Sequence, residues 1–358
     1  MATITTAPYD QFNPDHRPTE PVLFRRGVSD WPAIAKWSPS YLKSVVGQEL
    51  VRVAVSKTGA FRYSADGTAD GSDQEMLEGV PFGRAAEWIL DESPTASKYY
   101  INRFGLTDAL PKLLGDLRFT DTDGPLPPTL WFGSAGTSSP LHFDGGDNLH
   151  CQVFGCKRWV FFSPEDTSKL YPVPEGSKLP HLSLVDLEHI DYGLYPSLEA
   201  ATPIEVELEP GDMVFVPAFW WHFVKSRSVS ISVNRWWDHD LRQHTTPNSL
   251  RLLRGQYRQC VANTEHAKKR SPDHWLVIAQ AVIDRSPDAA VVMGACALQR
   301  LAHESGFAQA EPRHTAVQER WQRLIKLAIE PDACGIKQTD AAAFLKDVRR
   351  AAGAGTES

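Results

Sequence analysis

The sequence predicts a mainly β core, folded as a double-sheet jelly roll or barrel, with N-terminal α+β elements and a C-terminal helical region. Three observations lead to this expectation. Short alternating apolar segments separated by turn residues fill residues 126–240, which is typical of antiparallel sheets. Residues 1–125 mix strand and helix patterns, and residues 241–358 have helical apolar spacing. These three stretches are the expected domains.

The N-terminal region is expected to support the barrel. Residues 21–27 have the pattern of a strand that ends in a glycine turn, and residues 51–55 alternate as a second strand. Residues 82–90 have helical apolar spacing, and residues 99–102 have the pattern of another strand. A loop with proline and glycine, residues 121–128, closes the region.

The central region has the pattern of antiparallel strands with one long insertion. Residues 149–153 and 159–162 flank a glycine turn, which indicates a β-hairpin. Residues 163–203 carry many prolines, glycines and charges, and we expect a long loop there. Further strand patterns, with a tight turn at 210–212, occupy residues 204–208, 214–217 and 229–236.

Composition narrows the class of protein. The chain has 358 residues, 42% of them hydrophobic and 23% charged, as in an ordinary soluble protein. No apolar run reaches the ~20 residues of a membrane helix, and the first residues lack a secretion signal, so no membrane role is expected. The net charge is −7 and the basic residues are dispersed, which argues against nucleic-acid binding. Five cysteines without a C-x-x-C pair indicate reduced thiols and a cytoplasmic protein.

The candidate site consists of His142, Asp144 and His222. Two histidines and a carboxylate in the order H-x-D…H are the facial ligand set of non-haem Fe(II) oxygenases, which leaves other metal positions open. Residues two apart on a strand project to the same face, so His142 and Asp144 can reach one ion. His222 must then come from a strand that is a neighbour in space. Such ligands favour Fe(II), although Mn or Zn would also bind.

A second H-x-D, His189-Ile190-Asp191, shows that this motif alone is weak evidence. His189 lies in the polar, proline-bounded stretch, and no strand pattern follows it. His142 and Asp144 instead precede a strand-like segment. We therefore expect the metal at the first motif.

The surrounding residues carry a more specific pattern. It comprises Ser139 through Asp144, Asn148, Gly155 through Lys157, Pro210 through His222, and Ser232 through Trp236. This pattern resembles the JmjC/cupin-like 2-oxoglutarate oxygenases, most closely the subgroup with the asparaginyl hydroxylase that inhibits the hypoxia-inducible transcription factor. The resemblance implies a double-stranded β-helix, Fe(II) as cofactor, and 2-oxoglutarate and O₂ as co-substrates.

The resemblance also implies a role for each matching residue. His142, Asp144 and His222 would bind Fe(II), and Lys157 would pair with the distal carboxylate of 2-oxoglutarate. The remaining assignments are Ser139 and Tyr100 as hydroxyl donors to that carboxylate, Asn148 and Asn234 at the iron end of the co-substrate, and Asn102, Trp131 and Trp236 in the substrate pocket.

Some of these residues have plainer interpretations. Lys157 after Gly155 could be a solvated hairpin residue. The tryptophans, among them Trp236, are more often packing residues than substrate contacts. His150 is expected on the same strand face as Asn148, but a packing or loop role is favoured for it.

The resemblance implies hydroxylation of a C–H bond in an amino-acid side chain of a peptide or protein, with release of succinate and CO₂. Alternatives are a free amino acid or natural-product intermediate as substrate, and N-methyl-lysine demethylation by the same chemistry. A non-catalytic metal-binding cupin is the alternative of another class. Helices that follow such barrels often form a homodimer, so residues 241–358 would make a dimer contact or cover the substrate.

Overall fold

The computed structural model describes most of the chain up to residue 237. The described residues are 2–61, 74–93, 95–120, 124, 126–174, 179, 181–237, 248 and 251. Nearly all belong to the first of two compact units, Met1–His239. The helices expected between residues 241 and 358, and the dimer contact assigned to them, lie outside the described residues apart from Asn248 and Arg251.

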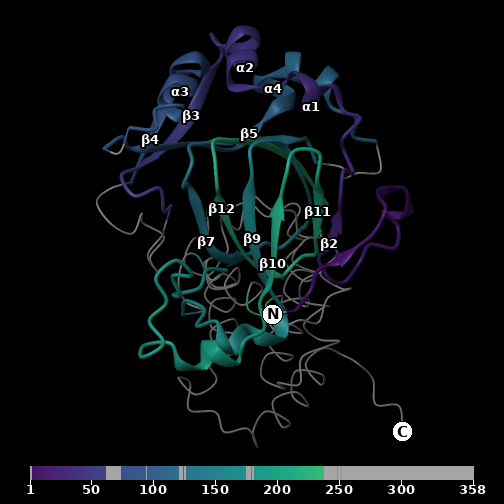
Figure 1. Cartoon of the computed structure of the whole chain (residues 1–358), viewed down its shortest axis with the longest axis vertical. Coiled ribbons are helices and arrows are strands. Elements are labelled where there is room, and N and C mark those ends of the chain that lie inside the picture. Colours follow the sequence, from purple (N-terminus) through teal and green to yellow (C-terminus); the bar gives the residue numbers. More distant parts are fainter. Residues whose placement is uncertain are drawn as a thin grey trace, which may run out of the picture. The chain divides into compact units, whose positions relative to one another are not determined.

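Eight consecutive strands form the core (Figure 1). They are β6 (Thr129–Gly133), β7 (Ser138–Phe143), β8 (Asp147–Phe154), β9 (Lys157–Phe162), β10 (Ile204–Leu208), β11 (Met213–Val216), β12 (Trp221–Ser226) and β13 (Ser230–Trp237). Strands β6, β8, β11 and β13 lie in a large sheet, whereas β7, β9, β10 and β12 form the small sheet, ordered β10-β9-β12-β7. The polypeptide thus passes repeatedly between two antiparallel sheets, which confirms the double-stranded β-helix.

The N-terminal strands extend the large sheet at both edges. They are β1 (Thr5–Thr6), β2 (Val22–Phe24), β3 (Leu50–Ser56), β4 (Gln74–Pro81) and β5 (Lys98–Gly105). The full order is β1-β2-β11-β8-β13-β6-β5-β3-β4. Strands from both sides of the boundary expected near residue 125 therefore belong to one sheet.

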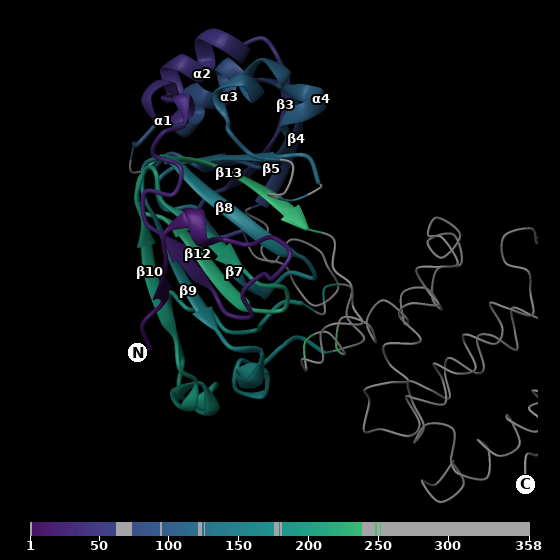
Figure 2. The same cartoon turned by 90° about the vertical axis from the view of Figure 1, so that its right-hand side faces the viewer.

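Short helices gather at one end of the unit, as both views show (Figures 1 and 2). They are α1 (Pro32–Lys36), α2 (Pro39–Val46), α3 (Phe82–Ile89) and α4 (Leu106–Ala109), with the 3₁₀ turn η2 (Pro111–Asp116). Another 3₁₀ turn, η1 (Tyr9–Gln11), lies between β1 and β2 in the chain. Both α1 and α2 begin with a proline, where a missing N–H costs nothing. In the described part of the protein, none of the helices has the length and apolarity needed to cross a membrane.

The inner and outer faces of the large sheet differ in character. On β8 and β13 the outward residues are apolar and join the core with α2 and α3: Leu149, Cys151, Val153, Ile231 and Val233. The alternate residues are polar or aromatic and buried: Asn148, His150, Gln152, Ser232, Asn234 and Trp236. Since neighbouring residues on a strand point to opposite faces, the polar set lies inside the barrel. The sequence of these strands thus builds a polar interior.

The hairpin predicted around Gly155 is wrong. β8 pairs with β11 and β13, and β9 pairs with β10 and β12, so the two strands belong to different sheets. Gly155 has φ +66°, and a Cβ there would lie 2.0 Å from the carbonyl oxygen of Val229. A local turn pattern cannot distinguish a return within one sheet from a crossing to the other.

The segment between β9 and β10 is more ordered than the expected loop. It contains η3 (Pro164–Lys169) and η4 (Pro196–Ala200) and lies opposite α1–α4 (Figures 1 and 2). Its residues 181–183 run beside β7, where the Ser183 amide donates to the Leu141 carbonyl at 2.9 Å. Glu188 accepts a hydrogen bond from Ser138 at 3.0 Å and pairs with Lys225 of β12. These contacts hold the segment against the small sheet.

Replacement of Asp116 by asparagine is expected to destabilise the helical end by about 2 kcal/mol. Asp116 is buried and accepts from Lys36 Nζ at 2.6 Å, Trp37 Nε1 at 3.0 Å and the Tyr41 hydroxyl at 3.0 Å. Burial alone would raise the pKa of Asp116, but these three hydrogen bonds lower it overall. Because the pKa of Asp116 is lower in the folded protein than in the unfolded chain, where it is about 4, ionised Asp116 stabilises the fold at pH values above about 4. This contribution is lost as the pH falls through the pKa of the folded state.

Urea unfolding at about pH 7 and about pH 3 measures the effect, with the exposed Asp108→Asn as control. The Asp116→Asn penalty should shrink at the lower pH. An equal penalty at both values would show that the charge does not contribute.

Candidate metal and co-substrate site

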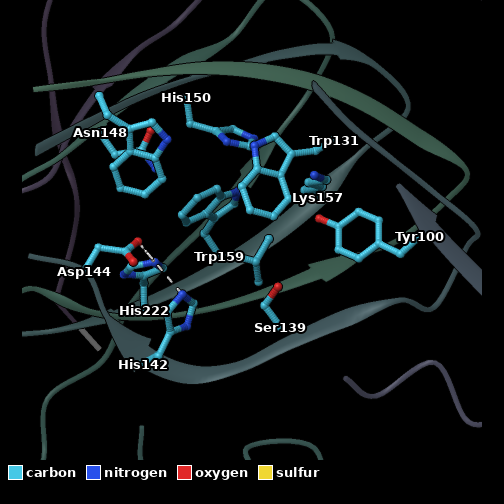
Figure 3. A pocket seen from close by; sticks show the side chains of 12 residues that line it. Tyr100, Trp131, Ser139, His142, Asp144, Asn148, His150, Lys157, Trp159 and His222 are labelled. Carbon is cyan, nitrogen blue, oxygen red and sulfur yellow. Dashed lines mark ion pairs between the residues drawn. The ribbon is translucent and has the colours of Figure 1, made fainter. Parts of the chain in front are cut away.

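His142, Asp144 and His222 converge at one end of the barrel interior (Figure 3). His142 lies near the end of β7 and is the cross-strand partner of His222 on β12, while Asp144 follows β7 directly. Asp144 Oδ2 lies 3.4 Å from His222 Nε2 and 4.0 Å from His142 Nε2. One ligand atom from each residue fits within 4.8 Å of the others. The expected spatial neighbour of His142 is thus present.

Backbone carbonyls orient both imidazoles. Nδ1 of His142 lies 2.7 Å from the Pro140 carbonyl oxygen, and Nδ1 of His222 lies 3.0 Å from that of Trp220. A carbonyl can only accept, so Nδ1 carries the proton in each ring. Nε2 then offers its lone pair to the shared space, which is the usual arrangement of metal-binding histidines.

Burial and neighbouring charges set the protonation of this group. Burial, followed by the charge of His222, lowers the pKa of His142 to about 3. Burial alone would raise the pKa of Asp144, but the adjacent His222 and His142 rings hold it well below its usual range. A neutral imidazole and an ionised carboxylate are the forms that bind a divalent cation. The donor set therefore fits Fe(II), as the facial triad requires.

The second H-x-D is not a metal group. The His189 side chain is 81% exposed and contacts Asp186. The Asp191 carboxylate accepts from the backbone amides of Gly193 and Leu194, as in an ordinary turn. Within the described residues, only His142, Asp144 and His222 form a cluster of three possible ligands.

The three candidate ligands lie in a cavity of about 350 Å³, including its mouth. That volume is in the range of small-molecule sites. The lining residues are Tyr100, Trp131, Ser139, His142, Asp144, Asn148, His150, Lys157, Trp159, His222, Val224 and Trp236 (Figure 3). Both sheets contribute, since β8 and β13 supply one wall and β7, β9 and β12 the other.

Lys157 and Tyr100 lie across the cavity from Asp144 (Figure 3). Lys157 is 1% exposed, donates to Ser232 Oγ at 2.7 Å and has its Nζ 5.8 Å from the centre of the Tyr100 ring. Among the described residues, no carboxylate lies within ion-pair distance of it. The solvated role considered for Lys157 is therefore wrong, because this strand end faces the barrel interior.

Burial weakens the charged forms of both groups. It lowers the pKa of Lys157 to about 7 and raises that of Tyr100 well above its usual value. A buried cation without a counter-ion is costly. An anionic ligand would supply the missing charge, and the Tyr100 and Ser139 hydroxyls would supply further donors.

Asn234 supports the cavity wall from behind. Its amide nitrogen donates to Asn148 Oδ1 at 2.8 Å, and its oxygen accepts from Trp131 Nε1 at 2.9 Å and from the Thr129 hydroxyl. Asn148 and Trp131 line the cavity, whereas Asn234 does not. Asn234 therefore orients two lining residues.

Two indole N–H groups of the lining also fit an oxygen-rich ligand. Nε1 of Trp159 and Nε1 of Trp236 are buried and have no hydrogen-bond partner among the described residues. Buried donors are normally paired. Together with Lys157, they make the cavity rich in donors, whereas Asp144 is its only carboxylate. This chemistry fits a dicarboxylate such as 2-oxoglutarate.

Asn102 does not join the cavity lining that was predicted for it. The alternation that should place it beside Tyr100 is interrupted, because the pairing of β5 with β6 shifts between Ile101 and Phe104. Asn148 lines the cavity from β8, in the large sheet. It does not share a strand with His142, because β7 ends at Phe143 and β8 begins at Asp147.

Sequence reasoning missed Trp159 and Val224 and favoured packing for His150. The His150 ring meets Trp159 edge-on at 4.7 Å, and Trp159 stacks on His222 at 5.7 Å. Strand parity could have identified Trp159, because it is two residues after Lys157 on β9. Val224 has the same relation to His222 on β12.

Comparisons with known proteins agree with this geometry. A Jumonji C domain-containing protein 5 of Drosophila melanogaster is 30% identical over 229 residues, 61% of this chain and 55% of that protein. A lysine-specific demethylase 8 of Xenopus tropicalis is 32% identical, over 62% of this chain and 48% of the relative. The human HSPB1-associated protein 1 is 30% identical, over 61% and 47% respectively. The chain spans about half the length of these relatives.

Residues 12–243 match the sequence profile of the cupin-like domain family. This stretch contains every lining residue of the cavity and all eight strands of the double-stranded β-helix. It covers more than half of the sequence. The chain therefore belongs to the family of cupin-like, JmjC-type domains.

Proposed function

We propose that this protein is an Fe(II)- and 2-oxoglutarate-dependent oxygenase that hydroxylates a C–H bond in an amino-acid side chain of a peptide or protein. The observation that carries the proposal is the cavity itself. It has a His-Asp-His group at one side and a buried lysine without a carboxylate partner at the other. A dicarboxylate that reaches from the metal to Lys157 satisfies both ends.

Each part of the cavity has a defined task. With Fe(II) bound, oxidation of 2-oxoglutarate by O₂ to succinate and CO₂ is coupled to insertion of one oxygen atom into a substrate C–H bond. His142, Asp144 and His222 hold the metal and leave positions open. Lys157, Tyr100 and Ser139 bind the distal carboxylate and so orient the co-substrate, while the tryptophans of the lining exclude water.

Anaerobic titration of the purified protein with Fe(II) and 2-oxoglutarate tests the proposal. We expect a metal-to-ligand charge-transfer band, and succinate release once air is admitted. A protein that shows no band and forms no succinate with any metal would be a non-catalytic cupin or a different enzyme.

Substrate class separates two candidate reactions. The name of the Xenopus tropicalis relative refers to lysine demethylation, which favours N-methyl-lysine as the alternative substrate. Mass spectrometry of peptides or lysate distinguishes the reactions, because hydroxylation adds one oxygen whereas demethylation removes a methyl group as formaldehyde. A free amino acid or natural-product intermediate would gain oxygen without any peptide doing so. A cytoplasmic location and a homodimer through residues 241–358 stay predictions.

Affinity for 2-oxoglutarate is expected to fall as the pH rises above 7. The pKa of Lys157 is lowered by burial to about 7, and only its ammonium form attracts a carboxylate. Below this pH the ammonium is present and the affinity is at its plateau. Each further pH unit weakens the apparent affinity by up to about tenfold.

Tryptophan fluorescence titrations with 2-oxoglutarate from about pH 6 to about pH 9 measure this dependence. Lys157→Arg is the control, since a guanidinium stays charged over the whole range. A wild-type dissociation constant that does not change with pH would contradict the prediction.

A further inference from the structure

The turn that carries Asp144 lies between β7 and β8 and packs against other segments. Gly145 and Gly146 separate the ligand from Asp147, and glycine permits backbone conformations that other residues avoid. At Gly146 a Cβ would lie 2.7 Å from the Trp237 carbonyl oxygen, so the turn packs tightly against the end of β13. Contacts from other segments therefore contribute to the position of Asp144.

Residues 217–220, which lead into β12, supply these contacts. The Phe219 amide donates to the Asp144 carbonyl oxygen at 2.8 Å, and the Ala218 amide donates to Asp147 Oδ1 at 2.7 Å. Phe219 has φ +68°, a left-handed conformation that costs energy for a bulky residue and is held by its surroundings. The Trp220 carbonyl in the same segment orients His222. One short segment thus touches two metal ligands.

Arg17 belongs to the N-terminal arm, residues 7–21 between β1 and β2, and completes the arrangement. Its Nε donates to Asp147 Oδ2 at 2.6 Å, and its guanidinium lies 5.5 Å from the Trp237 ring centre. The side chains of Arg17 and Asp147 are 26% and 4% exposed. The same arm accepts a hydrogen bond at the Thr19 carbonyl from Trp220 Nε1, at 2.9 Å.

We propose that Arg17 and Asp147 are positioning residues of the metal centre. Asp147 bridges the N-terminal arm and residues 217–220, and so fixes the separation of Asp144 from His222. The inference rests on the proposed metal site and adds a dependence of that site on the first twenty residues. Neither Arg17 nor Asp147 belongs to the cavity lining.

The expected effect is a loss of metal affinity. Removing Arg17 leaves the buried Asp147 carboxylate without its cation, so the Asp147 side chain turns toward water and releases the Ala218 amide. Changes in residues that orient metal ligands weaken metal binding by about tenfold to a hundredfold. We expect this loss for Arg17→Gln and for Asp147→Asn. The double variant should lose no more than either single variant, because both changes break the same link.

The sequence offers a matched control. Arg25 also comes from the N-terminal region and pairs at 2.5 Å with a buried aspartate, Asp212, whose side chain is 5% exposed. Asp212 belongs to the turn between β10 and β11. Its carboxylate accepts hydrogen bonds from Arg25 and from the backbone amides of Arg26 and Glu209, and none of these lies in β7, β12 or residues 217–220. Arg25→Gln should therefore lower the melting temperature as Arg17→Gln does, but leave metal affinity unchanged.

The experiment is a titration of the 358-residue chain with Co(II), followed by the d–d absorption of the bound ion. Weaker binding in Arg17→Gln and Asp147→Asn but not in Arg25→Gln supports the proposal. Equal Co(II) affinity in Arg17→Gln and the wild type overturns it, provided that Asp144→Ala loses binding. If Asp144→Ala binds as well as the wild type, the proposed metal site itself fails. Should Arg17→Gln not fold, Arg17→Lys keeps the charge and is expected to show a smaller loss of the same sign.

Discussion

His142→Ala is expected to abolish the anaerobic charge-transfer band and succinate formation together. The substitution removes one of three ligand atoms and leaves Asp144 and His222, whose carboxylate and imidazole lie 3.4 Å apart. Two protein ligands hold a divalent ion poorly, because each lost ligand is replaced by water. The fold should persist, since alanine keeps the backbone pairing of residue 142 with residue 222.

His189→Ala is the matched control for this prediction. It removes the histidine of the second H-x-D, which is exposed and does not belong to the cavity lining. We expect wild-type spectra and activity from it. A His142→Ala protein that retains the band would place the metal elsewhere.

Lys157→Met is expected to weaken 2-oxoglutarate binding by about thirtyfold to several thousandfold while metal binding persists. Methionine keeps most of the aliphatic length and removes the only buried ammonium of the cavity lining. Losing one partner of a buried, hydrogen-bonded charge pair costs about 2 to 5 kcal/mol, which corresponds to that range. The Ser232 hydroxyl, which accepts from Lys157 in the structure, cannot supply a replacement cation.

Parallel titrations with Co(II) and with 2-oxoglutarate separate the two effects. Lys43→Met, an exposed change on α2, is the control. Equal losses of metal and co-substrate affinity in Lys157→Met would indicate general damage to the barrel and contradict the assigned role. The removal of an unpaired buried charge should also raise the melting temperature of the ligand-free protein.

The fold class followed from strand alternation, because period-2 patterns are a local property of the sequence. Strand pairing did not follow, since it is non-local: β9 pairs with β12, which begins nearly sixty residues after β9 ends. The turn at Gly155 therefore looked like a hairpin although it joins two sheets. β4 was not predicted, because its residues do not alternate in exposure as a half-buried strand does.

The convergence of His142, Asp144 and His222 into one candidate metal-binding group could be predicted because each residue type has a direct chemical meaning. The cavity wall was harder, since its residues are ordinary in isolation. Trp159 and Val224 could be assigned to the cavity wall only because they lie on the same strand faces as Lys157 and His222, respectively. The prediction for Asn102 was wrong because it assumed regular alternation of side chains along β5. The pairing of β5 with β6 is irregular there, and the sequence does not reveal this.

The pairing of β9 with β12 also determines how the site can vary. His222 pairs with Phe161, and Ser226 pairs with Lys157. Lys157 therefore lies four residues from His222 along the paired strands, a separation of about 13 Å at 3.3 Å per residue. Sliding one strand by a single residue would turn its lining side chains outward, and the smallest permitted slide, two residues, changes the separation by about 6.6 Å. One methylene group of a keto acid is far shorter than that step. Selection for a longer or shorter acid must therefore come from exchanging the residue at position 157 or its neighbours, with the strands left in place.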